Sequence, residues 1–137
     1  MINLFRNAFI AVSLGAVSMS YASAEIAVIV NPKNAATRMF SEQAAQFFVG
    51  KSALFKPIEQ ADGSPIREEF YRKVLGKDND QMKAIWSKIV FTGQGLAPKQ
   101  FTSSANVKKA VAADVNAIGY IDKAEMDDSV KAILTVP

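Results

Sequence analysis

The segment of the sequence best suited to binding chemistry is EQADGSPIREEFYRKVLGK, which covers residues 59–77. Ser64 is a good N-cap residue, and Pro65 follows at the first helical position, where the missing N–H costs nothing. An exposed helix N-terminus offers unpaired N–H groups and the positive end of the helix dipole, and both favour a bound anion. The segment therefore predicts a helix ended by Gly76 whose start is either an anion site or only a well-capped turn. Whether or not a ligand binds, we expect Ser64→Ala to cost about 1 kcal/mol of stability as a lost cap.

The amino-acid composition argues against catalysis. The chain has no histidine and no cysteine, so the commonest general base, the thiol nucleophile and the usual zinc ligands are all missing. Its glycine-rich segment TGQGLAPK lacks the GxxxxGK[ST] pattern of a phosphate-binding P-loop. A serine–lysine or paired-carboxylate enzyme would still be compatible with the composition, but no motif for either stands out. We therefore expect a protein that is not an enzyme and that has no cofactor or metal.

The first 24 residues are typical of a signal peptide. One basic residue, Arg6, precedes an apolar run, and Ala22-Ser23-Ala24 provides the small side chains that signal peptidase needs. The apolar run is about 12 residues, whereas a membrane-spanning helix needs about 20, which disfavours a retained anchor. We expect cleavage after Ala24 and a periplasmic protein.

Cleavage after Ala24 would leave a single domain, 25–137, whose net charge falls from +3 to +2 because Arg6 is the only charge removed. The charge is small and no run of lysine and arginine occurs, so a nucleic-acid partner is not expected.

Periodicity and turn residues predict an α/β protein. The expected elements are strands at 26–30, 53–58, 117–121 and 130–136, and helices at 41–49, 64–75, 78–91 and 103–114, with a loop at 92–99. Ser41 is the expected N-cap of the first helix, and Asp78 with Gln81 forms a capping box for the third. Since helices alternate with apolar strands, we expect a central sheet with helices packed on its faces.

The ordered set of segments SEQAAQFFVGK, SPIREEFYRKVLGK, MKAIWSKIVFTGQG and VKKAVAADVNAIGYID resembles a family of small secreted proteins. These are periplasmic substrate-binding proteins of type 2, related to the phosphate-binding proteins of ABC phosphate uptake systems. The resemblance covers nearly all of 26–136 and implies one lobe of that fold. It also implies a solute-binding module for phosphate or a similar oxyanion, with ABC transporter membrane subunits as partners.

The resemblance implies an anion site at the Asp62-Gly63-Ser64 turn, where helix N–H groups and a hydroxyl bind the ligand. To these residues we add Arg67, one helical turn further, where a guanidinium group can meet two oxygens. If Arg67 has no such role, we expect a surface side chain in water or in a salt bridge. The loop that begins at Thr92 is a further candidate, because its hydroxyl would extend the site if the loop lies beside Ser64.

The sequence departs from the family in ways that keep a second function open. Pro65-Ile66 replaces a Gly-Thr pair, Gln60 stands where the larger proteins have an arginine, and Phe55 stands where they have a tryptophan. The chain is also about the length of one lobe, so a partner chain or a homodimer would have to complete a cleft. The alternative is therefore a single-lobe interaction or sensor protein of the cell envelope that no longer transports a ligand.

Overall fold

The computed structural model describes residues 25–137, so the predicted signal peptide lies outside the described residues. The elements in chain order are β1 (Ile26–Val30), α1 (Ser41–Phe48), β2 (Lys56–Gln60), α2 (Pro65–Phe70), η1 (Tyr71–Leu75), α3 (Asn79–Phe91), β3 (Lys99–Phe101), α4 (Ser104–Ala112), β4 (Ala117–Asp122), η2 (Lys123–Glu125) and β5 (Lys131–Val136). The short η1 is a π-helical turn that continues α2 without a break. Among residues 25–137, no helix has the length and apolar character needed to cross a bilayer.

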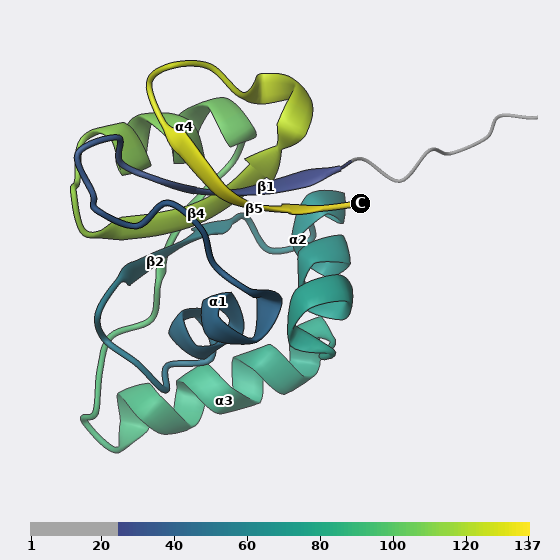
Figure 1. Ribbon diagram of the computed structural model, residues 1–137. Helices are drawn as coiled ribbons and strands as arrows, with labels where there is room; N and C mark the ends of the chain where they lie inside the picture. Colours follow the sequence, from purple (N-terminus) through teal and green to yellow (C-terminus); the bar gives the residue numbers. More distant parts are fainter. Residues whose placement is uncertain (1–24) are drawn as a thin grey trace, which may run out of the picture.

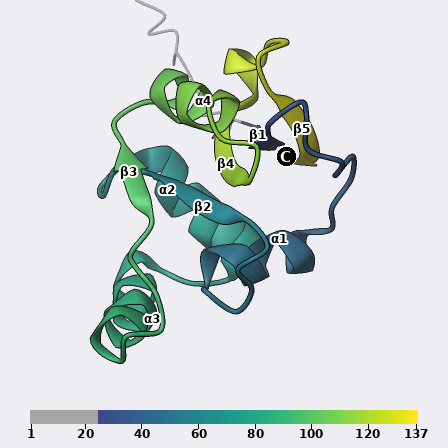
Figure 2. The ribbon, with the colours of Figure 1, turned by 90° about the vertical axis from the view of Figure 1, so that its left-hand side faces the viewer.

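The five strands form one mixed sheet in the order β3-β2-β4-β1-β5 (Figure 2). The strand β2 runs parallel to both β3 and β4, whereas β1 is antiparallel to β4 and β5. The carboxyl ends of β2, β3 and β4 therefore lie at the same edge of the sheet. The chain enters α2 after β2 and α4 after β3, so both helices begin at that edge, where open α/β sheets bind ligands.

Helices cover both faces of the sheet, with α4 on one face and α1, α2 and α3 on the other (Figure 1). The central strands β1 and β4 are almost wholly buried, as expected for strands covered on both sides. Alternate residues of β1 face the two cores: Val28 packs with the helices α1 to α3, and Ile29 packs with α4. The α/β architecture with helices on both faces is therefore confirmed.

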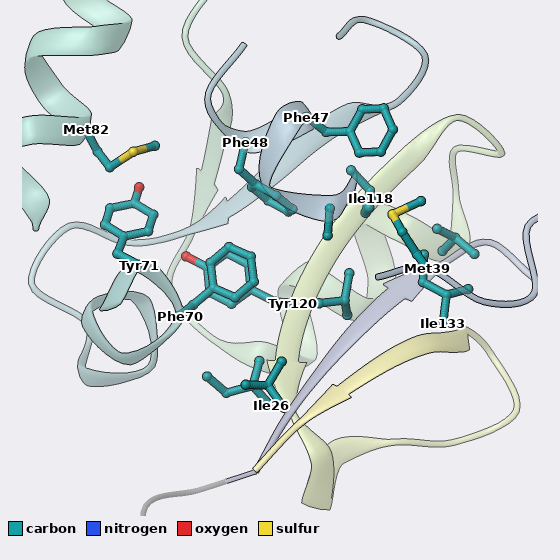
Figure 3. Close-up of a cluster of buried hydrophobic side chains, with 14 residues drawn as sticks. Ile26, Met39, Phe47, Phe48, Phe70, Tyr71, Met82, Ile118, Tyr120 and Ile133 are labelled. Atoms are coloured by element: carbon teal, nitrogen blue, oxygen red, sulfur yellow. The ribbon is translucent and has the colours of Figure 1, made fainter. Parts of the chain in front are cut away.

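Aromatic rings dominate the larger core (Figure 3). The rings of Phe70 and Tyr120 stack with their centroids 3.9 Å apart, and Phe48 meets both of them edge to face, at 4.8 and 5.6 Å. These contacts fix the helix formed by α2 and η1 against β4. They thereby position the turn that leads into α2.

Some sequence expectations are wrong in detail. Phe40, not Ser41, is the N-cap of α1, and its N–H donates to the side chain of Gln43 at 2.9 Å. The expected loop at 92–99 is followed by a short strand that was not expected, β3, which begins at Lys99 and separates α3 from α4. The strand expected at 53–58 is shifted to Lys56–Gln60, where it pairs with β3 and β4. Gly76 does end its helix, with a φ of 62°.

The caps of α2 and α3 differ in a way that stability measurements will detect. Ser64 is the N-cap of α2, but its side chain makes no cap hydrogen bond, whereas Asp78 accepts the Gln81 N–H at 2.8 Å. We therefore expect Asp78→Ala to lower the free energy of unfolding by about 1 kcal/mol and Ser64→Ala by less than about 0.5 kcal/mol. Urea denaturation of both variants would test this, and equal losses would contradict it.

Candidate functional site

The Asp62-Gly63-Ser64 turn lies directly after β2, at the carboxyl edge of the parallel strands. Gly63 has a φ of +82°, a conformation that favours glycine, and the Ser64 N–H closes the turn onto the Ala61 carbonyl at 3.0 Å. Within residues 25–137, neither the Gly63 N–H nor the Ile66 N–H donates a hydrogen bond. Two backbone donors and the Ser64 hydroxyl are therefore available to a ligand.

Asp62 ties this turn to α3 and β3. Its carboxylate accepts hydrogen bonds from Asn79 at 2.8 Å and from Lys83 at 2.9 Å, and its N–H donates to the Gln100 side chain at 3.2 Å. The Lys83 ammonium group, with help from Asn79, holds the pKa of the Asp62 carboxyl below its usual range. The turn is therefore a fixed structure rather than a loose loop.

Arg67 does not lie at the surface of the turn. It is 5% exposed, and its Nη1 donates to the carbonyl of Gln60 at 3.0 Å, while its Nε lies 3.5 Å from the Glu59 carboxylate. The guanidinium group also covers the ring of Tyr71, 5.1 Å from its centroid. The expectation of an exposed side chain is wrong, because α2 turns this position toward β2.

Glu59 is a buried acid that the sequence analysis did not single out. It is 3% exposed, and its Oε2 accepts hydrogen bonds from the hydroxyls of Tyr71 and Tyr120, while its Oε1 has no partner among the described residues. Burial raises its pKa from 4.5 to about 7, although the two hydroxyls and Arg67 oppose this rise. Burial, and next the Glu59 carboxylate, raise the pKa of Tyr71 above its usual range.

Gln60 occupies the position where the resembling proteins have an arginine, and it faces inward. It is 2% exposed, and its side-chain amide donates to the Ser104 hydroxyl at 3.2 Å and to the Tyr120 carbonyl at 3.1 Å. The Ser104 hydroxyl also accepts the Asp122 N–H at 3.1 Å. Gln60 thus connects the starts of α2 and α4, and it presents no group to an anion.

Thr92 lies at the opposite end of α3 from the residues that bind Asp62. Its hydroxyl donates to the Lys88 carbonyl at 2.7 Å, at the C-cap of the helix. Nine residues separate it from Lys83, which corresponds to roughly 13 Å along a helix axis. The structure therefore brings Asp62, Gly63 and Ser64 together and leaves Thr92 apart from them.

A cavity of about 450 Å³ is lined by Lys83 and Gln100, the two side chains that connect Asp62 of the turn to α3 and β3. Within residues 25–137, no group of three or more acidic residues is arranged to hold a metal ion. The unpaired N–H groups at this edge are suited to an anion. The Asp62 and Glu59 carboxylates of the same region are acceptors, so they can only receive hydrogen bonds from a ligand.

No family model matches the sequence, and no curated protein matches it. Solved structures do. One match is a protein from Clostridium perfringens that is assigned as a phosphate ABC transporter substrate-binding protein and was solved with bound phosphate. Its TM-score is 0.65 and its sequence identity is 25%, and the match covers 80% of this chain and 45% of the other chain. An ABC-type phosphate transport receptor from Vibrio cholerae matches with a TM-score of 0.62 and 20% identity over 80% of this chain and 46% of its own.

PstS from Borrelia burgdorferi matches with a TM-score of 0.58 and 14% identity, again over 80% of this chain and over 47% of its own. The chain therefore spans less than half the length of the phosphate transport proteins that it resembles. Its mixed five-stranded sheet with helices on both faces has the fold of a single lobe of those proteins.

Proposed function

We propose that this protein is a periplasmic solute-binding module for phosphate or a similar oxyanion, associated with ABC-type uptake. The observation that carries the proposal is the Asp62–Ser64 turn at the carboxyl edge of parallel strands, where two backbone N–H groups and a hydroxyl have no hydrogen-bond partner among the described residues. Helix N-termini at this edge are general anion sites in α/β proteins. The likeness to a lobe of a phosphate-bound protein supports the same ligand.

Asp62 favours an oxyanion that still carries a proton. Its carboxylate stands next to the free N–H groups, and an ionised carboxylate only accepts hydrogen bonds. Phosphate near neutral pH retains a proton that it can donate, whereas sulfate has none. We therefore expect phosphate to bind better than sulfate.

The site is open on one side, so we expect weak binding to the isolated chain. Asp62 is exposed, and solvent and salt screen charged contacts at such a position. A second surface, from ABC transporter membrane subunits or from another copy of this chain, would enclose the ligand and strengthen its binding.

Thermal melting with phosphate, sulfate and chloride at matched ionic strength tests the proposal. A ligand that binds only the folded state stabilises it, by about 1.4 kcal/mol at ten times its Kd. We expect phosphate to raise the Tm more than sulfate, and Ser64→Ala to reduce this rise. Asp78→Ala is the matched control, because it removes a cap of α3 and should lower the Tm without changing the phosphate effect. Equal shifts with phosphate and chloride would contradict the proposal.

A second candidate function is that of an interaction or sensor protein of the envelope. Three large apolar side chains favour it, since Leu54, Phe91 and Leu96 are 79%, 93% and 86% exposed. Leu96 lines, with Ala53 and Phe55, an apolar groove of about 680 Å³. The same melts separate the two candidates, since only an anion-binding protein is stabilised by the anion.

A further inference from the structure

The cavity beside the turn is larger and more apolar than a bare phosphate ion requires. It has a volume of about 450 Å³ and lies between η1, α3 and the segment that leads into β3. Its apolar wall includes Tyr71, Met82, Trp86, Phe91 and Pro98. Figure 3 shows two of these side chains, Tyr71 and Met82, near each other beside the aromatic core. Pockets of this size and lining accommodate small organic molecules.

The cavity and the turn share two side chains. Lys83 and Gln100 line the cavity, and they bind the carboxylate and the N–H of Asp62 at 2.9 and 3.2 Å. A ligand whose charged group lies on the turn would therefore have the cavity directly beside it. A tetrahedral anion alone would leave the apolar wall in contact with water.

The inner wall of the cavity also carries buried polar atoms without partners. Glu59 and Arg67 both line it, and they are 3% and 5% exposed. Glu59 Oε1 and Arg67 Nε have no hydrogen-bond partner among the described residues. Buried polar groups are nearly always paired, by protein, by water or by a ligand. A hydroxyl on the organic part of a ligand would supply the missing partner.

We propose that the cavity binds the organic part of a small phosphate monoester, or of a similar oxyanion ester, whose charged group lies on the Asp62–Ser64 turn. The inference rests on the proposed function and narrows its ligand from inorganic phosphate to an organophosphate. Lys83 is the residue common to both halves of the site, because it lines the cavity and its ammonium group reaches the turn.

Isothermal titration calorimetry with inorganic phosphate, phenyl phosphate and phenol tests the inference. Burying a phenyl ring against the aromatic wall should make phenyl phosphate bind at least tenfold more tightly than inorganic phosphate. Ser87 is exposed and lines the cavity, so Ser87→Phe should fill the cavity and abolish this advantage while phosphate binding persists. Lys88→Phe adds the same ring at the neighbouring exposed position outside the cavity. This control variant should still bind phenyl phosphate more tightly than inorganic phosphate.

Different failures have different meanings in this experiment. If phosphate binds and phenyl phosphate binds no more tightly, the inference is overturned and the proposed function stands. If neither binds, both are overturned. If phenol binds as well as phenyl phosphate, the phosphate group contributes nothing to binding, and the inference is overturned. If the tenfold advantage survives Ser87→Phe, the phenyl ring does not lie in the cavity, and the inference is again overturned.

Discussion

Replacing Arg67 with alanine is expected to lower the free energy of unfolding by about 3–5 kcal/mol at pH 8, the range typical of removing one partner from a buried ion pair. The loss arises because the Glu59 carboxylate, which is 3% exposed in the native protein, would lose the cation that lies 3.5 Å from it. The Gln60 carbonyl would also lose the hydrogen bond that it accepts from Arg67 at 3.0 Å. Urea denaturation followed by circular dichroism measures the change.

Arg72→Ala is the matched control for this variant. Arg72 lies in the same continuous helix, but its side chain is 70% exposed and stands 4.0 Å from Glu69, at the limit of an ion pair. Such surface pairs contribute about 0–1 kcal/mol, so the control should lose little. A loss for Arg67→Ala as small as that for Arg72→Ala would mean that Arg67 and Glu59 are not a buried pair. At pH 5 the loss for Arg67→Ala should shrink, because Glu59 then carries a proton.

Local features of the fold could be predicted from the sequence because they depend on neighbouring residues. The capping box of Asp78 and Gln81, the proline that opens α2 and the glycine that ends η1 are all confirmed. The strongly apolar strands β1 and β4 were also evident from their composition alone. The turn at Asp62–Ser64 follows from the same local chemistry, since a glycine before a serine cap permits the sharp entry into the helix.

Long-range pairing could not be predicted in the same way. The strand β3 has only three residues, Lys-Gln-Phe, and it exists because β2 pairs with it, which no local pattern reveals. Arg67 and Glu59 likewise look like surface charges, because their burial depends on α2 packing against β2. An arginine eight positions after a glutamate matches no local rule, so a single sequence offers no signal for this pair.

Replacing Glu59 with glutamine is expected to remove a pH dependence of stability between pH 4.5 and about pH 7. Burial raises the pKa of Glu59 from 4.5 to about 7, so the folded state binds this proton more tightly than the unfolded state does. Its contribution to stability is therefore complete below pH 4.5 and is lost as the pH rises through 7. The loss corresponds to roughly 3 kcal/mol. Glutamine carries no charge at any of these pH values, so the variant should lack this loss.

Urea denaturation at pH 5, 6, 7 and 8 measures this effect, with Glu68→Gln as the control because Glu68 is exposed in α2. The native protein and the control should both lose stability as the pH rises through this range, whereas the stability of Glu59→Gln should not show this loss. Carboxyls with lowered pKa values, such as Asp127 at about 2, titrate below this window and leave the comparison unaffected. A slope in Glu59→Gln equal to the native slope would place the titrating group elsewhere. A flat native profile would mean that Arg67 and the two tyrosine hydroxyls fully offset the burial of Glu59, and that the stability of the protein around the end of β2 is insensitive to pH.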